Sequence, residues 1–199
     1  CILLNKDASL RKLTIQGKEY TGKKLMDKFD RIVRQGYMSK DMPTKKYGED
    51  IMWYLWSGVD SPLFGKKKMA TFERLFIKDK STHEEIKNPY YEFRNNEETC
   101  KMILEEFGLD PKTSHIFNGH VPVKTSKGES PVKANGRLIV IDGGFSTAYQ
   151  KVTGIAGYTL IANSHGLTLT AHQPFVSKSI AIEQKIDIVS QRSILETSH

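Results

Sequence analysis

The sequence has few cysteines and no long apolar segment. Only two of its 199 residues are cysteines, Cys1 and Cys100, and they lie far apart in the chain. Two such residues form neither a disulfide framework nor a Cys-x-x-Cys metal pair, which favours a reducing compartment. No run reaches the ~18 consecutive apolar residues that a membrane-spanning helix requires. We therefore expect a cytoplasmic protein that does not bind a membrane.

The charge of the chain is unbalanced towards the basic side. Thirty lysines and arginines against 23 acidic residues give a formal net charge of +7. A positive surface attracts anions such as nucleic acid, anionic lipid and phosphorylated metabolites. No motif that reads DNA or RNA accompanies the charge, so we expect no nucleic-acid partner. Lysines that simply face water explain the same composition and remain the alternative.

Helical patterns dominate the first 110 residues. From Thr21, which can cap a helix, an apolar stripe follows at spacings of three and four. We expect further helices at 49–56, around 72–76, and at 97–107, the last capped by Asn95 or Asn96 and ended by Gly108. Short strands are expected at 2–5 and 10–16, followed by a turn at Gly17 and Lys18. Residues 38–46 and most of 79–96 are expected to be loops.

Short apolar runs between Gly and Asn turns indicate strands in the second half. The expected strands are 115–118, 137–141, 158–162 and 167–172, with a hairpin turn at 163–166. Isoleucines at 180, 182, 186 and 188 recur at period two, which predicts a long final strand before a frayed tail. We therefore divide the chain into a mostly helical part (1–110), a mostly β part (111–190) and a tail (191–199), all belonging to one α+β domain.

His120 is the sharpest local feature. It follows a short apolar run within Phe117-Asn118-Gly119-His120-Val121-Pro122, where glycine permits a tight turn and proline stiffens the chain. A side chain at the end of a strand is held rigidly enough to serve a site, and imidazole binds Mn, Fe or Zn. By itself, a histidine after glycine is more often a turn or packing residue.

Two further segments contain residues suited to chemistry. Asp142 follows an apolar strand and precedes two glycines, so it is a metal ligand, a base or a loop cap. The polar segment 124–135 and its flank carry basic residues that can bind phosphate oxygens, although surface charge is the commoner role. These residues are Lys124, Lys127, Lys133 and Arg137.

An ordered set of motifs resembles the class III fructose-1,6-bisphosphatases. The matching segments are Met52 to Lys66, Asn118 to Lys124, Gly128 to Ala134, Leu138 to Gln150 and Gly154 to Ile161. The resemblance implies the C-terminal part of a calcineurin-like metallophosphoesterase, a β-sandwich flanked by helices with two metals at its strand ends. It implies metal-dependent hydrolysis of fructose 1,6-bisphosphate to fructose 6-phosphate and phosphate, a gluconeogenic reaction, with Mn²⁺ as cofactor.

The resemblance also assigns roles to residues. His120 falls on the final Gly-His motif of that superfamily and is expected to be a metal ligand. Ser146 and Tyr149 fall on a loop that borders the metals, and with Lys124, Lys133 and Arg137 they form the expected substrate-binding set. The oligomeric state is left open, with a homo-oligomer as one option.

One departure from the family pattern bears on activity. The sequence has no Asp-x-His, Gly-Asp-x-x-Asp or Gly-Asn-His motif, so only His120 of the expected ligands is present. We therefore expect the chain to be a C-terminal fragment that is inactive in isolation. Two alternatives remain: a calcineurin-like phosphatase acting on phosphoproteins or dinucleotides, and a non-catalytic module that binds sugar phosphates or nucleotides.

Overall fold

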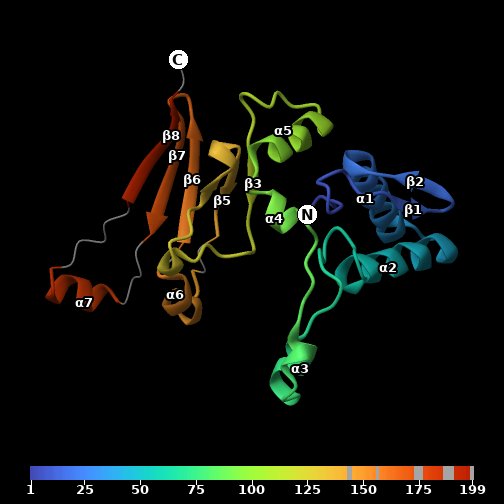
Figure 1. Cartoon of the computed structure of the whole chain (residues 1–199), viewed down its shortest axis with the longest axis horizontal. Coiled ribbons are helices and arrows are strands. Elements are labelled where there is room, and N and C mark those ends of the chain that lie inside the picture. The colour runs from blue at the N-terminus through green and yellow to red at the C-terminus, as the bar shows by residue number, and fades with distance from the viewer. Residues whose placement is uncertain (143–144, 156, 173–176, 186–190, 198–199) are drawn as a thin grey trace. The chain divides into compact units, whose positions relative to one another are not determined.

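The chain contains helices and three small separate sheets in the residues that the structure describes (Figure 1). This computed structural model describes residues 1–142, 145–155, 157–172, 177–185 and 191–197. The chain divides into two compact units, Cys1–Asp110 and Pro111–His199. Helices lie beside small sheets rather than alternating with the strands of one parallel sheet, so the class is α+β, as predicted. That both units belong to one domain stays a prediction.

Unit 1 begins with a buried segment and a two-stranded hairpin. Strands β1 (Leu13–Ile15) and β2 (Lys18–Tyr20) are antiparallel. Gln16 and Gly17 between them both have positive φ angles, of 51° and 76°. That conformation matches the right-handed twist of a tight hairpin. Residues 2–5, predicted as a strand, are largely buried but pair through only one bridge, between Leu4 and Leu10.

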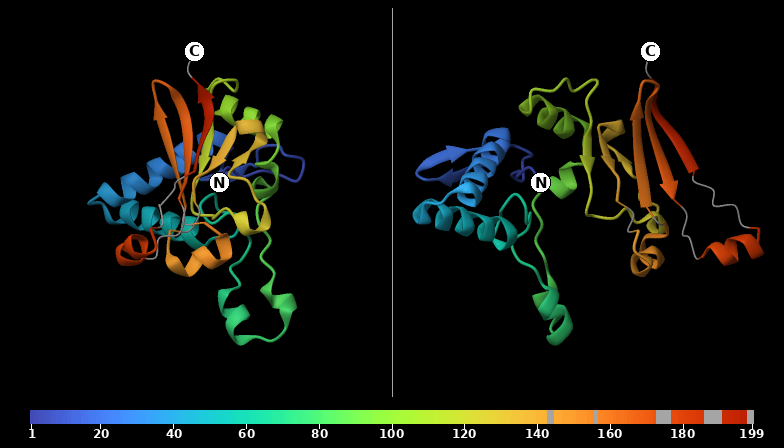
Figure 2. Two further views of the ribbon diagram at one scale, coloured as in Figure 1. Left: turned by 90° about the vertical axis from the view of Figure 1, so that its left-hand side faces the viewer. Right: turned by 180° about the vertical axis from the view of Figure 1, so that it is seen from behind.

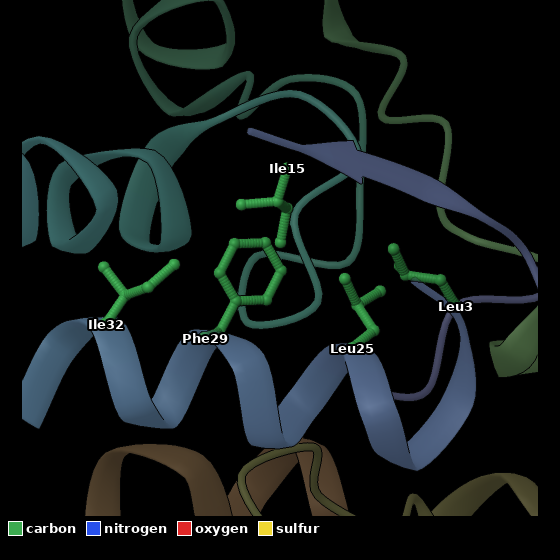
Figure 3. Close-up of a cluster of buried hydrophobic side chains, with 5 residues drawn as sticks. All are labelled: Leu3, Ile15, Leu25, Phe29 and Ile32. Atoms are coloured by element: carbon green, nitrogen blue, oxygen red, sulfur yellow. The ribbon is translucent and has the colours of Figure 1, made fainter. Parts of the chain in front are cut away.

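Helices α1 (Gly22–Met38) and α2 (Met42–Ser57) form the body of unit 1. Leu25, Phe29 and Ile32 lie along one face of α1, as the sequence spacing predicts. They pack with Leu3 and Ile15 into one buried cluster (Figure 3). The stripe of α1 therefore joins the first segment, the hairpin and α2 around one small core.

The start of α2 corrects a prediction. Residues 38–46 were expected to be a polar loop because they contain Pro43, but the helix already begins at Met42. Proline is tolerated in the first turn of a helix, where its missing N–H needs no partner. The carboxylate of Asp41 accepts a hydrogen bond from the backbone N–H of Thr44 at 3.0 Å and caps this end.

The rest of unit 1 consists of short helices. They are α3 (Thr71–Phe76), the 3₁₀ turn η1 (Lys80–His83), α4 (Tyr90–Phe93) and α5 (Glu97–Glu106). The Asn96 side chain caps α5 by accepting from Thr99 N, and Gly108 follows at φ 72°, both as predicted. The loop prediction for 79–96 misses η1 and α4. The buried Asn88 links α4 to the first segment, bonding both the N–H and the carbonyl of Leu4.

In unit 2, the first sheet has the order β3-β5-β4. Its strands are β3 (Ile116–Asn118), β4 (Val132–Lys133) and β5 (Leu138–Val140), with β3 and β5 parallel. Leu138, Ile139 and Val140 are all buried, so β5 is the centre of this sheet. The connection from β3 to β5 contains the 3₁₀ turns η2 (Thr125–Lys127) and η3 (Ala134–Gly136), where the sequence predicts only a polar loop.

The second sheet of unit 2 has the order β6-β7-β8. Strands β6 (Gly157–Asn163) and β7 (Gly166–His172) form the predicted hairpin, with Ser164 and His165 as its turn. Helix α6 (Thr147–Thr153) precedes this sheet and was not predicted.

The last segment departs from prediction twice. Residues 178–183, expected to open a long strand, form helix α7 (Lys178–Glu183) because the Ser177 hydroxyl caps it by accepting from Ile180 N. Ile186 and Ile188 lie outside the described residues. Where a frayed tail was expected, β8 (Gln191–Thr197) pairs antiparallel with β7. This segment becomes a strand by pairing with a distant strand, and its own sequence pattern does not predict that.

Candidate active-site segment

The carboxyl ends of β3 and β5 lie side by side, and His120 and Asp142 each follow one of them closely in the chain. Asn118 pairs with Val140, and the ladder continues as Ile141 N donates to Asn118 O at 2.8 Å. Val123 N then donates to Asp142 O at 2.8 Å, which folds the segment 119–123 over the end of β5. His120 and Asp142 each come two residues after a paired strand residue. Ligands of sheets with parallel strands commonly bind outside such strand ends.

His120 itself is held in an unusual conformation and left exposed. Its φ angle is 65°, the left-handed region that residues other than glycine seldom adopt. Val121 N donates to Gly119 O across it at 2.8 Å, and the fully buried Val123 anchors the segment a few residues later. Within the described part of the chain the imidazole makes no hydrogen bond or ion pair. The backbone therefore presents a free ring, and the role of His120 as metal ligand stays a prediction.

The described residues do not supply a complete metal site. Across 1–142, 145–155, 157–172, 177–185 and 191–197, no group of three or more His, Cys, Asp or Glu side chains is placed to hold a metal ion. An exposed imidazole at a strand end suits a metal as one donor. The described residues can therefore contribute a ligand to a metal site, but they do not form its whole ligand set.

The basic loop after His120 is braced by one carboxylate. Glu129 accepts from the backbone N–H of Lys124 at 3.0 Å and from the ammonium of Lys133 at 2.9 Å. The Lys133 side chain is only 12% exposed, so this ion pair is largely shielded from water. Burial, and secondarily the charge of Glu129, raises the pKa of the neighbouring Tyr158 phenol. Glu129 therefore orients Lys133.

The predicted phosphate-binding cations differ in availability. The Arg137 guanidinium donates to the carbonyls of Lys112 and Ser114, at 2.6 and 3.3 Å, and ties down the chain before β3. Lys133 is held by Glu129. The backbone N–H of Lys124 donates to Glu129, while its exposed side chain has no ion pair among the described residues. The free charge nearest His120 in sequence is thus that of Lys124, and substrate binding by all three stays a prediction.

The loop after β5 leads into α6. Ser146 is the residue before α6; it is exposed and its hydroxyl forms no capping hydrogen bond. Tyr149 belongs to α6, but its side chain lies outside what the structure describes. Phe145 packs near His172, with ring centroids 5.7 Å apart, and against Gly157, where an added Cβ would approach within 2.4 Å of the Phe145 ring. Among the described side chains, neither Ser146 nor Phe145 forms a hydrogen bond or ring contact with His120.

Two residues that sequence reasoning missed connect the basic loop to α6. Thr125 Oγ1 donates to Thr153 O at 2.6 Å, and Ser126 Oγ donates to Val152 O at 2.7 Å. Hydroxyl groups in a polar loop carry no signal in the sequence, because their partners are backbone carbonyls that any residue provides. They fix the loop to the C-terminal end of α6.

The whole chain matches one known family. The family model for the Firmicute fructose-1,6-bisphosphatase covers residues 1–199. The chain belongs to this family. It is 61% identical over 197 residues to "Fructose-1,6-bisphosphatase class 3 2" of Clostridium beijerinckii. It is 60% identical over 199 residues to "Fructose-1,6-bisphosphatase class 3" of Clostridium tetani.

The fructose-1,6-bisphosphatase relatives are much longer than this chain. The matches cover 98% and 100% of the chain but only 30% of either relative. No solved structure matches the chain.

Proposed function

We propose that the full-length polypeptide containing this segment hydrolyses fructose 1,6-bisphosphate to fructose 6-phosphate and phosphate, with Mn²⁺ as cofactor. Family membership carries the proposal, since the relatives that cover the chain are named as fructose-1,6-bisphosphatases. The net charge of +7 suits a doubly phosphorylated substrate.

The part played by this chain centres on the end of β3. His120 would hold a metal as one ligand among several, the others coming from elsewhere in the polypeptide. A bound metal pair supplies a nucleophilic hydroxide and neutralises phosphoryl charge. Lys124, on the braced loop beside His120, would donate to an oxygen of a substrate phosphate. Lys133 and Arg137 would have to exchange their present partners, Glu129 and backbone carbonyls, to bind a phosphate. Ser146 and Tyr149 would contribute from the start of α6.

The proposal also covers the calcineurin-like fold and the cellular location of the protein. We place both units in a calcineurin-like sandwich whose remaining strands come from outside residues 1–199. The cytoplasm is consistent with the free thiols of Cys1 and Cys100. No helix among the described residues is long and apolar enough to cross a membrane.

The experiment measures phosphate release from fructose 1,6-bisphosphate by the full-length polypeptide with and without Mn²⁺. His120→Ala should lower the rate at least ~100-fold and reduce the bound Mn²⁺ measured by equilibrium dialysis. His165→Ala, which removes an exposed histidine in the β6–β7 turn, is the matched control and should change neither quantity. Turnover of an aryl phosphate without turnover of this sugar would reject the substrate. Full activity and metal content in His120→Ala would reject the site.

A further inference from the structure

A hairpin-like arm, residues 66–87, projects from unit 1. Its base is an isolated antiparallel bridge between Lys66 and Lys87, continued by Lys67 N donating to Ile86 O at 2.9 Å. Its far end carries α3 and η1, which pack against each other. Figures 1 and 2 show α3 extending away from α1 and α2 in every view. The arm is therefore attached to its unit through its base alone.

A half-buried carboxylate stiffens the arm from inside. Glu85, whose side chain is 10% exposed, accepts from Ala70 N at 2.8 Å and pairs with Lys66 at 3.0 Å and Arg74 at 3.6 Å. Arg74 Nη2 also donates to His83 O at 3.1 Å, which joins α3 to η1. These bonds fix one side of α3 to the returning segment of the arm, residues 83–85. A six-residue helix is marginal by itself, so this network holds it in place.

The other side of α3 is apolar and open to solvent. Phe72, Leu75 and Phe76 are 74%, 70% and 77% exposed. Their spacing of three and four residues puts them on one face, and the two phenylalanine rings stack at 6.3 Å. Each phenylalanine side chain offers on the order of 150–250 Å² for burial. A contiguous exposed apolar patch on a rigid support is typical of an interaction surface.

Charge and chain length indicate what covers this patch. The exposed charges around α3 and η1 are mostly basic, with Lys68, Arg74, Lys78 and Lys80 against Asp79 and Glu84. Joining the tips of two copies would bring these like charges together, which opposes self-association. The chain spans only 30% of the length of its relatives, so more than half of each relative's length could supply the surface that covers the patch. We infer that the tip, Phe72, Leu75 and Phe76, docks intramolecularly into an apolar groove bordered by carboxylates on the part of the full-length polypeptide outside residues 1–199.

Amide hydrogen exchange compares the arm in two contexts, the 199-residue chain and the full-length polypeptide. In the full-length polypeptide the amides of α3 should exchange roughly tenfold or more slowly than in the chain. Phe72→Ser with Phe76→Ser should abolish this difference while leaving the exchange of α1 unchanged, because both rings are exposed and outside the core. Tyr37→Ser, at a 78% exposed aromatic residue on α1, is the matched control and should leave α3 protected.

A photo-crosslinking residue at position 76 of the full-length polypeptide identifies the occupant. The inference expects a cross-linked peptide that joins the arm to a segment outside residues 1–199 in a species of monomer mass. Equal exchange of α3 in both contexts would overturn the inference. So would cross-links that form only between two copies, or only with a different protein.

Discussion

At the scale of the residue, two glycines set how closely α1 and α2 approach. A Cβ added to Gly36 would lie 2.5 Å from the Cα of Gly48, and one added to Gly48 would lie equally close to the Cα of Gly36. Real Cβ atoms do not come this near to backbone, so either substitution must push the helices apart. The cluster that both helices cover would then lose contacts.

Gly36→Ala should therefore destabilise the chain. Alanine gains up to ~1 kcal/mol in helix propensity, but forcing extra volume into a packed contact costs about 1–3 kcal/mol. Urea unfolding, followed by the fluorescence of Trp53 and Trp56 on α2, measures the resulting change in the free energy of unfolding. Gly119→Ala is the matched control, because nothing lies within 4 Å of its added Cβ. A Gly36→Ala variant as stable as the parent would show that the helices can separate freely.

At the scale of the element, the arm depends on a charged carboxylate. The backbone N–H of Ala70, followed by Lys66 and Arg74, lowers the pKa of Glu85 against the opposing effect of burial. A carboxyl group whose pKa is lower in the folded state than in the unfolded state stabilises the folded state. This stabilisation is complete at pH values above the unfolded pKa, which is ~4.3 for glutamate. The contribution is lost as the pH falls through the lowered value.

The arm should consequently loosen in acid before the rest of unit 1. Amide exchange of α3, measured from pH 6 downwards and corrected for intrinsic rates, should accelerate relative to α1 below roughly pH 4.3. Glu85→Gln should remove most of this pH dependence and leave α3 loosened throughout; Asp79, whose pKa is lowered by the Ser81 N–H, accounts for the remainder. Glu84→Gln, at the exposed neighbouring residue, should keep the parental profile. An unchanged profile in Glu85→Gln would mean that this carboxylate does not hold the arm.

At the scale of the whole molecule, activity should require more polypeptide than this chain. The described residues offer His120 as one donor and no cluster of three metal-binding side chains. We therefore expect the 199-residue chain with Mn²⁺ to release phosphate from fructose 1,6-bisphosphate no faster than buffer does. The full-length polypeptide under the same conditions is the positive control. Release by the chain alone that disappears in His120→Ala would contradict this expectation.

The sequence by itself determined the family, the α+β class and several of the helices and strands. The stripe of α1, the Asn96 cap, Gly108 and the β6–β7 hairpin follow from local spacing and turn chemistry, because those features depend on neighbours in the chain. The motif around His120 also depends only on neighbours in the chain; the structure leaves this residue exposed after β3, and its role as a metal ligand stays a prediction.

Only the tertiary structure decided the rest. It paired β8 with β7, and it assigned Lys133 to Glu129 and Arg137 to backbone carbonyls. It also set α3 on a projecting arm with its apolar face exposed. The partners of β8 and Arg137 lie far away in the sequence. Glu129 is only four residues from Lys133, but the conformation of the loop between them decides whether the two side chains meet. Local composition therefore cannot tell a cation that is free to bind phosphate from one already engaged within the fold.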